Sequence, residues 1–181
     1  MNDPASIRRR GGRQVIPRPH HAVEEFDPPW DPAARWNVDE LVAPVAPESA
    51  PLLPTFPDAR HSAVLVVVSE GPSGAEVLLT RRSMQMRSHR GEISFPGGRC
   101  DPGETPAETA LREAEEEVGL DIGRPSVIGE LEHLSTIVSK SYIVPVVATL
   151  DERIELEPRT AEADRVMWTP VAELTRPGTY H

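Results

Sequence analysis

The sequence predicts an α+β fold in which one central helix packs on a sheet. Two observations support this prediction. Strand-like segments occur both before and after the helix, and several of them are separated by short turns of the kind found in hairpins. Because the helix must bury its apolar side against these strands, we expect the secondary structure to be arranged in layers.

The first third of the chain differs in composition from the rest. Residues 1–57 contain eleven of the 20 prolines and show little periodicity, so we predict a proline-rich extension that is partly disordered or wraps around the domain. Trp30, Trp36 and residues 38–41 could dock on a neighbouring surface or on a second subunit, and a homodimer is therefore compatible with the sequence. A plain linker is the simpler interpretation. The folded domain is predicted over residues 58–181.

Three strands are predicted ahead of the helix, at residues 63–68, 76–80 and 93–95. The first is a continuous, largely β-branched run that is typical of a buried strand, and a turn at residues 70–74 joins it to the second as a hairpin. The third lies within the arginine-rich loop 81–99, just before the sequence Pro96-Gly97-Gly98.

The central helix has well-defined ends. Thr105 can cap its amino terminus, Pro106 suits the first helical position, and Glu108 completes a capping box. Gly119 is well placed to end the helix. The residues expected to pack on the sheet are Ala107, Ala110, Leu111, Ala114 and Val118.

The elements predicted after the helix are strands at residues 126–136, 142–150 and 165–168 and a short helical turn at 170–174. A turn at residues 139–141 joins the first two of these strands.

The overall composition excludes several classes of function. A net charge of −10 disfavours binding to nucleic acid, and no apolar run approaches the roughly 20 residues that a membrane-spanning helix needs. The single cysteine, Cys100, rules out an internal disulfide and fits a reducing compartment. We therefore expect a cytoplasmic protein that binds neither nucleic acid nor membranes. An anionic substrate would need a metal ion or a local basic patch.

Three carboxylates, of Glu113, Glu116 and Glu117, lie on one side of the predicted helix. Like charges at this spacing repel one another, so they call for a counter-ion or a well-solvated surface. Mg²⁺ commonly lies between one or two carboxylates and a substrate phosphate, which makes a hard divalent cation the obvious candidate. From the charge pattern alone, a solvated acidic face is the simpler interpretation, and the spacing of the surrounding residues decides against it.

The residues around the helix follow a spaced pattern: Gly98, five residues, Glu104, seven residues, then Arg112-Glu113-Ala114-x-Glu116-Glu117-x-Gly119-Leu120. This pattern resembles the Nudix box, the signature of hydrolases that act on nucleoside diphosphates linked to another group. The one soft departure is Ala114, where the box usually has a bulkier aliphatic residue. The resemblance implies a Nudix-type α/β/α sandwich with a mixed sheet and the catalytic helix after a Gly-Gly loop.

The resemblance also implies roles for individual residues. The ligands it implies for Mg²⁺ or Mn²⁺ are Glu113 and Glu117 first, then Glu116 and the carbonyl oxygen of Gly98. Relatives differ in their general base, and either Glu113 or Glu116 could deprotonate the attacking water. Arg112 is expected to pair with Glu104 and to orient a carboxylate, so that both residues support catalysis.

A second pattern lies just upstream: Leu78-Leu79-Thr80-x-Arg82-Ser83, three residues, Arg87, three residues, Gly91, three residues, Phe95-Pro96-Gly97-Gly98. It resembles the extra motif of the coenzyme A pyrophosphatase branch of the Nudix family. The resemblance implies hydrolysis of coenzyme A and its acyl derivatives to 4′-phosphopantetheine, or its acyl form, and adenosine 3′,5′-bisphosphate. The substrate-binding residues we expect are Arg82, Arg87, Gly97 and Gly98, since the guanidinium fork binds phosphate bidentately.

Two other interpretations stay open. A Nudix enzyme could act on another diphosphate, such as ADP-ribose, NADH or a nucleoside triphosphate, and a catalytically silent module could use the fold to sense a nucleotide. Relatives also usually continue into a further strand and a closing helix, and we expect the chain to lack these after residues 168–174.

Overall fold

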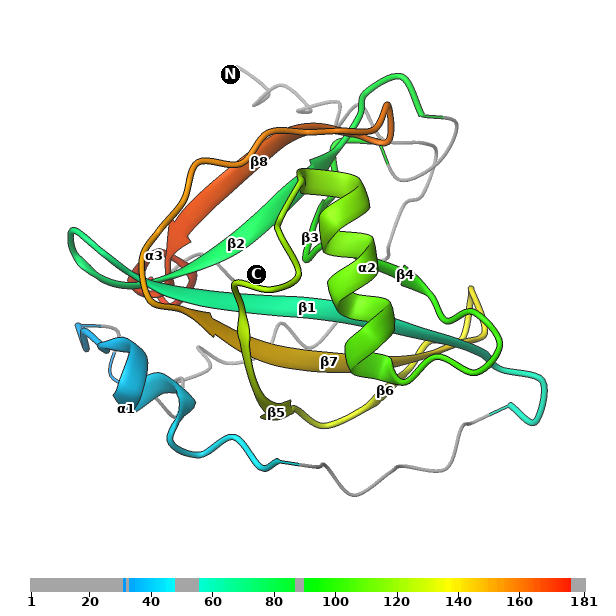
Figure 1. Ribbon diagram of the computed structural model, residues 1–181, viewed down its shortest axis with the longest axis horizontal. Helices are drawn as coiled ribbons and strands as arrows, with labels where there is room; N and C mark the ends of the chain where they lie inside the picture. The colour runs from blue at the N-terminus through cyan, green and yellow to red at the C-terminus, as the bar shows by residue number, and fades with distance from the viewer. Residues whose placement is uncertain (1–30, 32, 48–55, 87–89, 177–181) are drawn as a thin grey trace, which may run out of the picture.

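A computed structural model describes residues 31, 33–47, 56–86 and 90–176. Within this part of the chain eight strands form one sheet (Figure 1). Their bounds are β1 (Arg60–Gly71), β2 (Gly74–Arg82), β3 (Ile93–Ser94), β4 (Gly97–Arg99), β5 (Ser126–Glu130), β6 (Leu134–Ser135), β7 (Ser141–Leu150) and β8 (Ala163–Pro170). The main order is β3-β2-β1-β7-β5, with β4 beside β1, β6 beside β7 and β8 beside β2.

The sheet is mixed, as predicted. β1 runs parallel to β7 along the whole of β7, from Arg60 opposite Ser141 to Ser69 opposite Leu150. Every other pairing between the described strands is antiparallel. The predicted hairpin between β1 and β2 is confirmed by the register that places Gly71 opposite Gly74.

The helix α2 (Pro106–Val118) covers one face of the sheet and crosses over β1 and β7 (Figure 1). Its predicted ends are confirmed: Thr105 and Glu108 form a capping box, and Gly119 ends the helix with φ 75°, a left-handed conformation that glycine adopts readily. Ala110 and Ala114 are fully buried against the strands. Small side chains at these positions let the helix backbone approach the sheet closely, so the opposite side of α2 is left for polar residues.

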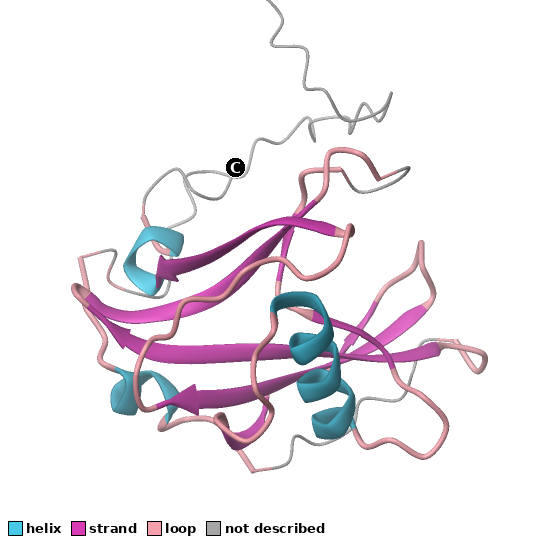
Figure 2. Ribbon diagram, turned by 45° about the horizontal axis from the view of Figure 1, so that its top comes forward, coloured by secondary structure: helices cyan, strands magenta, loops and turns pink. Residues whose placement is uncertain are grey.

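The two short helices lie toward one end of the sheet, away from α2 (Figure 2). They are α1 (Val38–Val42) and α3 (Val171–Leu174). Both pack on an apolar cluster around Val66, Val68 and Val77, which is separate from the cluster that α2 covers. The sheet therefore has apolar residues on both faces, and the predicted layered α+β arrangement is confirmed.

The segment 36–46, which we call the strap, joins two distant parts of the sheet. At one end the backbone N–H of Ala75 donates to the carbonyl of Trp36 at 2.8 Å. At the other end the N–H of Glu130 donates to the carbonyl of Ala46 at 3.0 Å, and these two residues form an isolated β-bridge. Gly129 permits this contact, because a Cβ atom there would lie 1.9 Å from the Ala46 oxygen.

We expect Gly129→Ala to detach the strap from β5. The added methyl group would overlap backbone atoms of the strap, and overpacking of this kind costs about 1–3 kcal/mol. Urea unfolding followed by circular dichroism measures the loss of stability. Gly123→Ala is a matched control, because its new methyl group would meet only the Asp121 side chain, at 3.3 Å. Equal stability of the two variants would contradict the prediction.

The prediction of one strand over residues 126–136 is wrong. β5 ends at Glu130, β6 begins at Leu134, and the register along β7 shifts between Val127 and Gly129. The interruption contains His133, whose buried ring contacts the Tyr142 hydroxyl through Nδ1 at 2.5 Å and the Glu130 carboxylate through Nε2 at 2.9 Å. These buried polar contacts occur where the pairing of a continuous strand with β7 is broken. The structure also differs from the prediction at residues 97–99, which form β4 instead of the end of a loop.

Candidate active site

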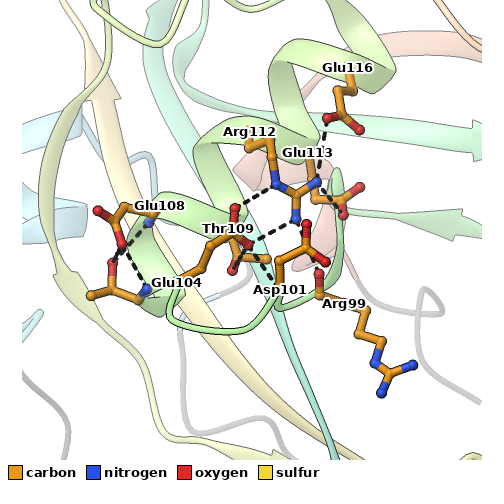
Figure 3. A network of polar contacts seen from close by, with 9 residues as sticks. Arg99, Asp101, Glu104, Glu108, Thr109, Arg112, Glu113 and Glu116 are labelled. Carbon is orange, nitrogen blue, oxygen red and sulfur yellow. Dashed lines mark hydrogen bonds and ion pairs between the residues drawn. The ribbon is translucent and has the colours of Figure 1, made fainter.

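The guanidinium group of Arg112 lies at the centre of a polar network on the exposed side of α2 (Figure 3). It donates two hydrogen bonds to Glu104, from Nε at 2.8 Å and from Nη2 at 3.1 Å, so the predicted Arg112–Glu104 pair is present. Nη1 donates to Glu113 Oε1 at 2.9 Å and lies 3.5 Å from Glu116 Oε1. Arg112 therefore joins the loop before the helix to two of the three carboxylates.

Glu104 is held from several directions. Besides the bonds from Arg112, its carboxylate accepts hydrogen bonds from the backbone N–H of Asp101 at 3.0 Å and from the Thr109 hydroxyl at 2.9 Å. The hydrogen bonds from Arg112, and then that from Asp101, lower the pKa of Glu104 to about 2. These hydrogen bonds favour the ionised form of Glu104 and use its acceptor sites within the protein, which suits a supporting role and not a reacting one.

Two of the predicted metal ligands, Glu113 and Glu117, lie beside Gly97 and Gly98. The Glu113 carboxylate fits so closely against Gly98 that a Cβ atom there would lie 2.4 Å from Glu113 Oε1. The backbone N–H of Gly97 donates to Glu117 Oε2 at 3.4 Å. Since β4 holds both glycines against β1, the sheet fixes where the carboxylates of Glu113 and Glu117 meet the backbone.

Glu117 is perturbed in the opposite direction from Glu104. Burial is the largest of the effects that together raise the pKa of Glu117 to about 7; the hydrogen bond from Gly97 lowers this pKa, and the negative charges of Glu113 and Glu162 raise it. A buried carboxylate beside like charges is stabilised by a nearby cation.

The donor set therefore fits a hard divalent cation. Carboxylate oxygens of Glu113 and Glu117 lie beside the backbone of Gly97 and Gly98, and carboxylate oxygens are ligands that suit Mg²⁺ or Mn²⁺. In the conformation described, Arg112 contacts Glu113 and Glu116, and no three metal-binding side chains of the described residues converge on one point. Glu116 is the outermost of the three, with 56% of its side chain exposed.

Arg82 is the last residue of β2. Its positive charge lowers the pKa of Glu117, which places it within electrostatic reach of the predicted metal ligands. Its Nη2 atom is paired with Glu162 Oε2 at 3.3 Å. The other predicted phosphate-binding residue, Arg87, lies outside the described residues. Glu162 was missed by the sequence analysis, because it lies just before β8 and belongs to neither motif.

No helix among the described residues is long and apolar enough to cross a membrane.

Comparison with known proteins identifies the family. The sequence model described as "NUDIX domain" matches residues 59–181, more than half of the chain. The chain belongs to the Nudix family. The α+β sandwich with a mixed sheet predicted from the Nudix box is thereby confirmed.

Two relatives are similar over most of the Nudix domain. "Nudix hydrolase 3" of Caenorhabditis elegans is 38% identical over 130 residues, which cover 70% of this chain and 54% of that protein. "Uncharacterized Nudix hydrolase NudL" of Photorhabdus laumondii is 40% identical over 124 residues, covering 67% of this chain and 65% of its own length. The chain therefore spans less than two thirds of either relative.

Solved structures show the same fold. The Nudix hydrolase RenU of M. smegmatis aligns with a TM-score of 0.55 and 27% identity, covering 67% of this chain and 80% of that one. The Nudix domain of Shewanella oneidensis NrtR, complexed with ADP ribose, aligns with a TM-score of 0.52 and 21% identity, covering 78% of this chain and 88% of the other. The second likeness shows the fold alone.

Proposed function

We propose that this Nudix domain hydrolyses the diphosphate of a nucleotide derivative in a metal-dependent reaction. The observation that carries the proposal is the pair of carboxylates, of Glu113 and Glu117, set against Gly97 and Gly98. The names of the two relatives, both called Nudix hydrolases, support it. We assign the metal to Glu113, Glu117, Glu116 and the Gly98 carbonyl, and the phosphate contacts to Arg82 and Arg87 with the backbone of Gly97 and Gly98.

The chemistry follows from the charges on the substrate. Diphosphate oxygens repel an incoming nucleophile, and a divalent cation at this site would neutralise them and lower the pKa of a bound water. Glu113 and Glu117 would hold that charge, while Arg112 and Glu104 fix the position of Glu113. Glu113 or Glu116 would accept the proton of the attacking water.

For the substrate, we propose coenzyme A and its acyl derivatives. The resemblance of residues 78–98 to the coenzyme A branch supports this choice, and a positive charge of Arg82 that acts on Glu117 is compatible with a phosphate contact. The products would be 4′-phosphopantetheine, or its acyl form, and adenosine 3′,5′-bisphosphate. We further propose a cytoplasmic location, as the single cysteine suggests.

A panel of substrates with Mg²⁺ or Mn²⁺ tests the proposal. We expect the highest kcat/KM with coenzyme A among coenzyme A, dephospho-coenzyme A, ADP-ribose, NADH and diadenosine tetraphosphate. Because coenzyme A carries an additional 3′-phosphate, at least one of Arg82→Ala and Arg87→Ala should reduce its turnover about tenfold more than that of the dephospho form. Cleavage of another nucleotide while coenzyme A stays intact would rule out the proposed substrate but not diphosphate hydrolysis.

A further inference from the structure

The Arg82–Glu162 ion pair beside the carboxylate group is a weak one. A single contact of 3.3 Å joins Arg82 Nη2 to Glu162 Oε2, and 33% and 57% of the two side chains are exposed. Exposed ion pairs joined by a single contact contribute little to stability, because water competes for both charges. The neighbouring pair is tighter: Arg81 Nε lies 2.7 Å from Asp164 Oδ1, and Asp164 also accepts a bond from the N–H of Met84.

Arg82 has an unused hydrogen-bond donor. Its Nε atom is buried and has no partner, and no other buried side-chain nitrogen or oxygen of the described residues lacks one. A buried donor without an acceptor is unfavourable, so the side chain gains if it moves to a position where Nε also finds an oxygen. A phosphate group offers that second oxygen, since the guanidinium fork can donate two parallel hydrogen bonds to it.

The backbone holds Glu162 in place independently of this ion pair. Its carbonyl accepts a hydrogen bond from the N–H of Ser83 at 2.7 Å, and its own N–H donates to Thr160 Oγ1 at 3.3 Å. The same segment is tied to α2, because the N–H of Arg159 donates to the carbonyl of Glu117 at 2.8 Å. If Arg82 leaves Glu162, the carboxylate therefore stays nearby and competes for the guanidinium.

We propose that Glu162 is a placeholder for a substrate phosphate on Arg82. In the free protein its carboxylate contacts only Nη2 of the guanidinium. A phosphate of the nucleoside diphosphate substrate displaces the carboxylate and accepts hydrogen bonds from both Nη2 and Nε. Glu162 is then a positioning residue that keeps Arg82 oriented and lowers the affinity for the diphosphate. This inference rests on the proposed function in one respect, the assignment of Arg82 as a phosphate-binding residue.

The test is binding of ADP in the presence of Mg²⁺, measured by calorimetry, which does not depend on turnover of any substrate. We expect Glu162→Gln to lower the Kd for ADP by up to about fivefold, the limit set by an exposed ion pair. Asp164→Asn is the matched control: it weakens the adjacent Arg81 pair, on the next residue of β2, and should leave the Kd within about 1.5-fold of the wild-type value.

Arg82→Ala separates this effect from general electrostatics. In an Arg82→Ala background, Glu162→Gln should leave the Kd for ADP unchanged, because the competed arginine is missing. A gain that persists in this background would overturn the proposal, as would equal, weaker or undetectable ADP binding by Glu162→Gln. A tenfold loss of kcat with unchanged ADP affinity would instead place Glu162 in the reaction itself and also overturn it. The substrate panel tests the proposed function separately.

Discussion

Replacing Glu113 by glutamine should lower the rate of diphosphate hydrolysis at least a hundredfold while leaving the domain folded. The substitution removes a negative charge and one candidate metal ligand from the contact with Gly98, but keeps the size of the side chain. Steady-state kinetics over a range of Mg²⁺ concentrations measures the effect, and thermal melting confirms that the variant is folded.

Glu115→Gln is the control for this experiment. Glu115 is exposed on the same helix, and none of the described contacts of the carboxylate group involves its side chain, so its loss should change the rate less than twofold. If Glu113→Gln kept more than a tenth of the wild-type rate, Glu113 would be neither a required ligand nor the base. The silent nucleotide-sensing interpretation would then gain weight.

Gly97→Ala should have the largest effect on stability, a loss of about 3 kcal/mol together with the loss of activity. A Cβ atom at this position would lie 2.4 Å from the Ala63 carbonyl oxygen and 2.6 Å from Val64 Cα. These are backbone atoms of a buried strand, so β4 itself would have to move, and overpacking of this severity is at the upper end of the usual range. Because Gly97 and Gly98 also contact the carboxylates, the site would be displaced with the strand. Urea unfolding and a hydrolysis assay measure the two effects.

Gly103→Ala distinguishes steric overlap from backbone strain. Gly103 has φ of +93°, but an added Cβ would have no neighbour within 4 Å. We expect a cost of about 1 kcal/mol from the left-handed conformation alone and no direct effect on the site. A Gly97→Ala variant no less stable than Gly103→Ala would show that β4 accommodates the methyl group.

The sequence was sufficient to predict α2 because the information for that helix is local. Thr105, Glu108 and Gly119 define its ends within a few residues, and the buried alanines follow its period. The pairing of Arg112 with Glu104 could be anticipated for the same reason, since the loop and the helix are adjacent in the chain. Local rules therefore predicted the part of the site that one short segment builds.

Contacts between distant segments could not be predicted in this way. Glu162 reaches Arg82 because β8 pairs with β2, and neither the composition nor the spacing of the sequence indicates that pairing. The break between β5 and β6 was missed because His133 is buried by contacts with Tyr142 and Glu130, whereas its sequence neighbours look like a continuous strand. The roles of the carboxylates stay predictions until a metal-binding or kinetic experiment tests them.

The strap has a consequence for solubility as well as for stability. An outer strand with free N–H and C=O groups is a template on which another chain can add a strand. The N–H of Glu130 at the end of β5 is already used, because it donates to Ala46 of the same molecule. Because the strap occupies this end of β5, it blocks intermolecular strand pairing at that point, and we expect a protein with a detached strap to aggregate more readily while its Nudix core is still folded.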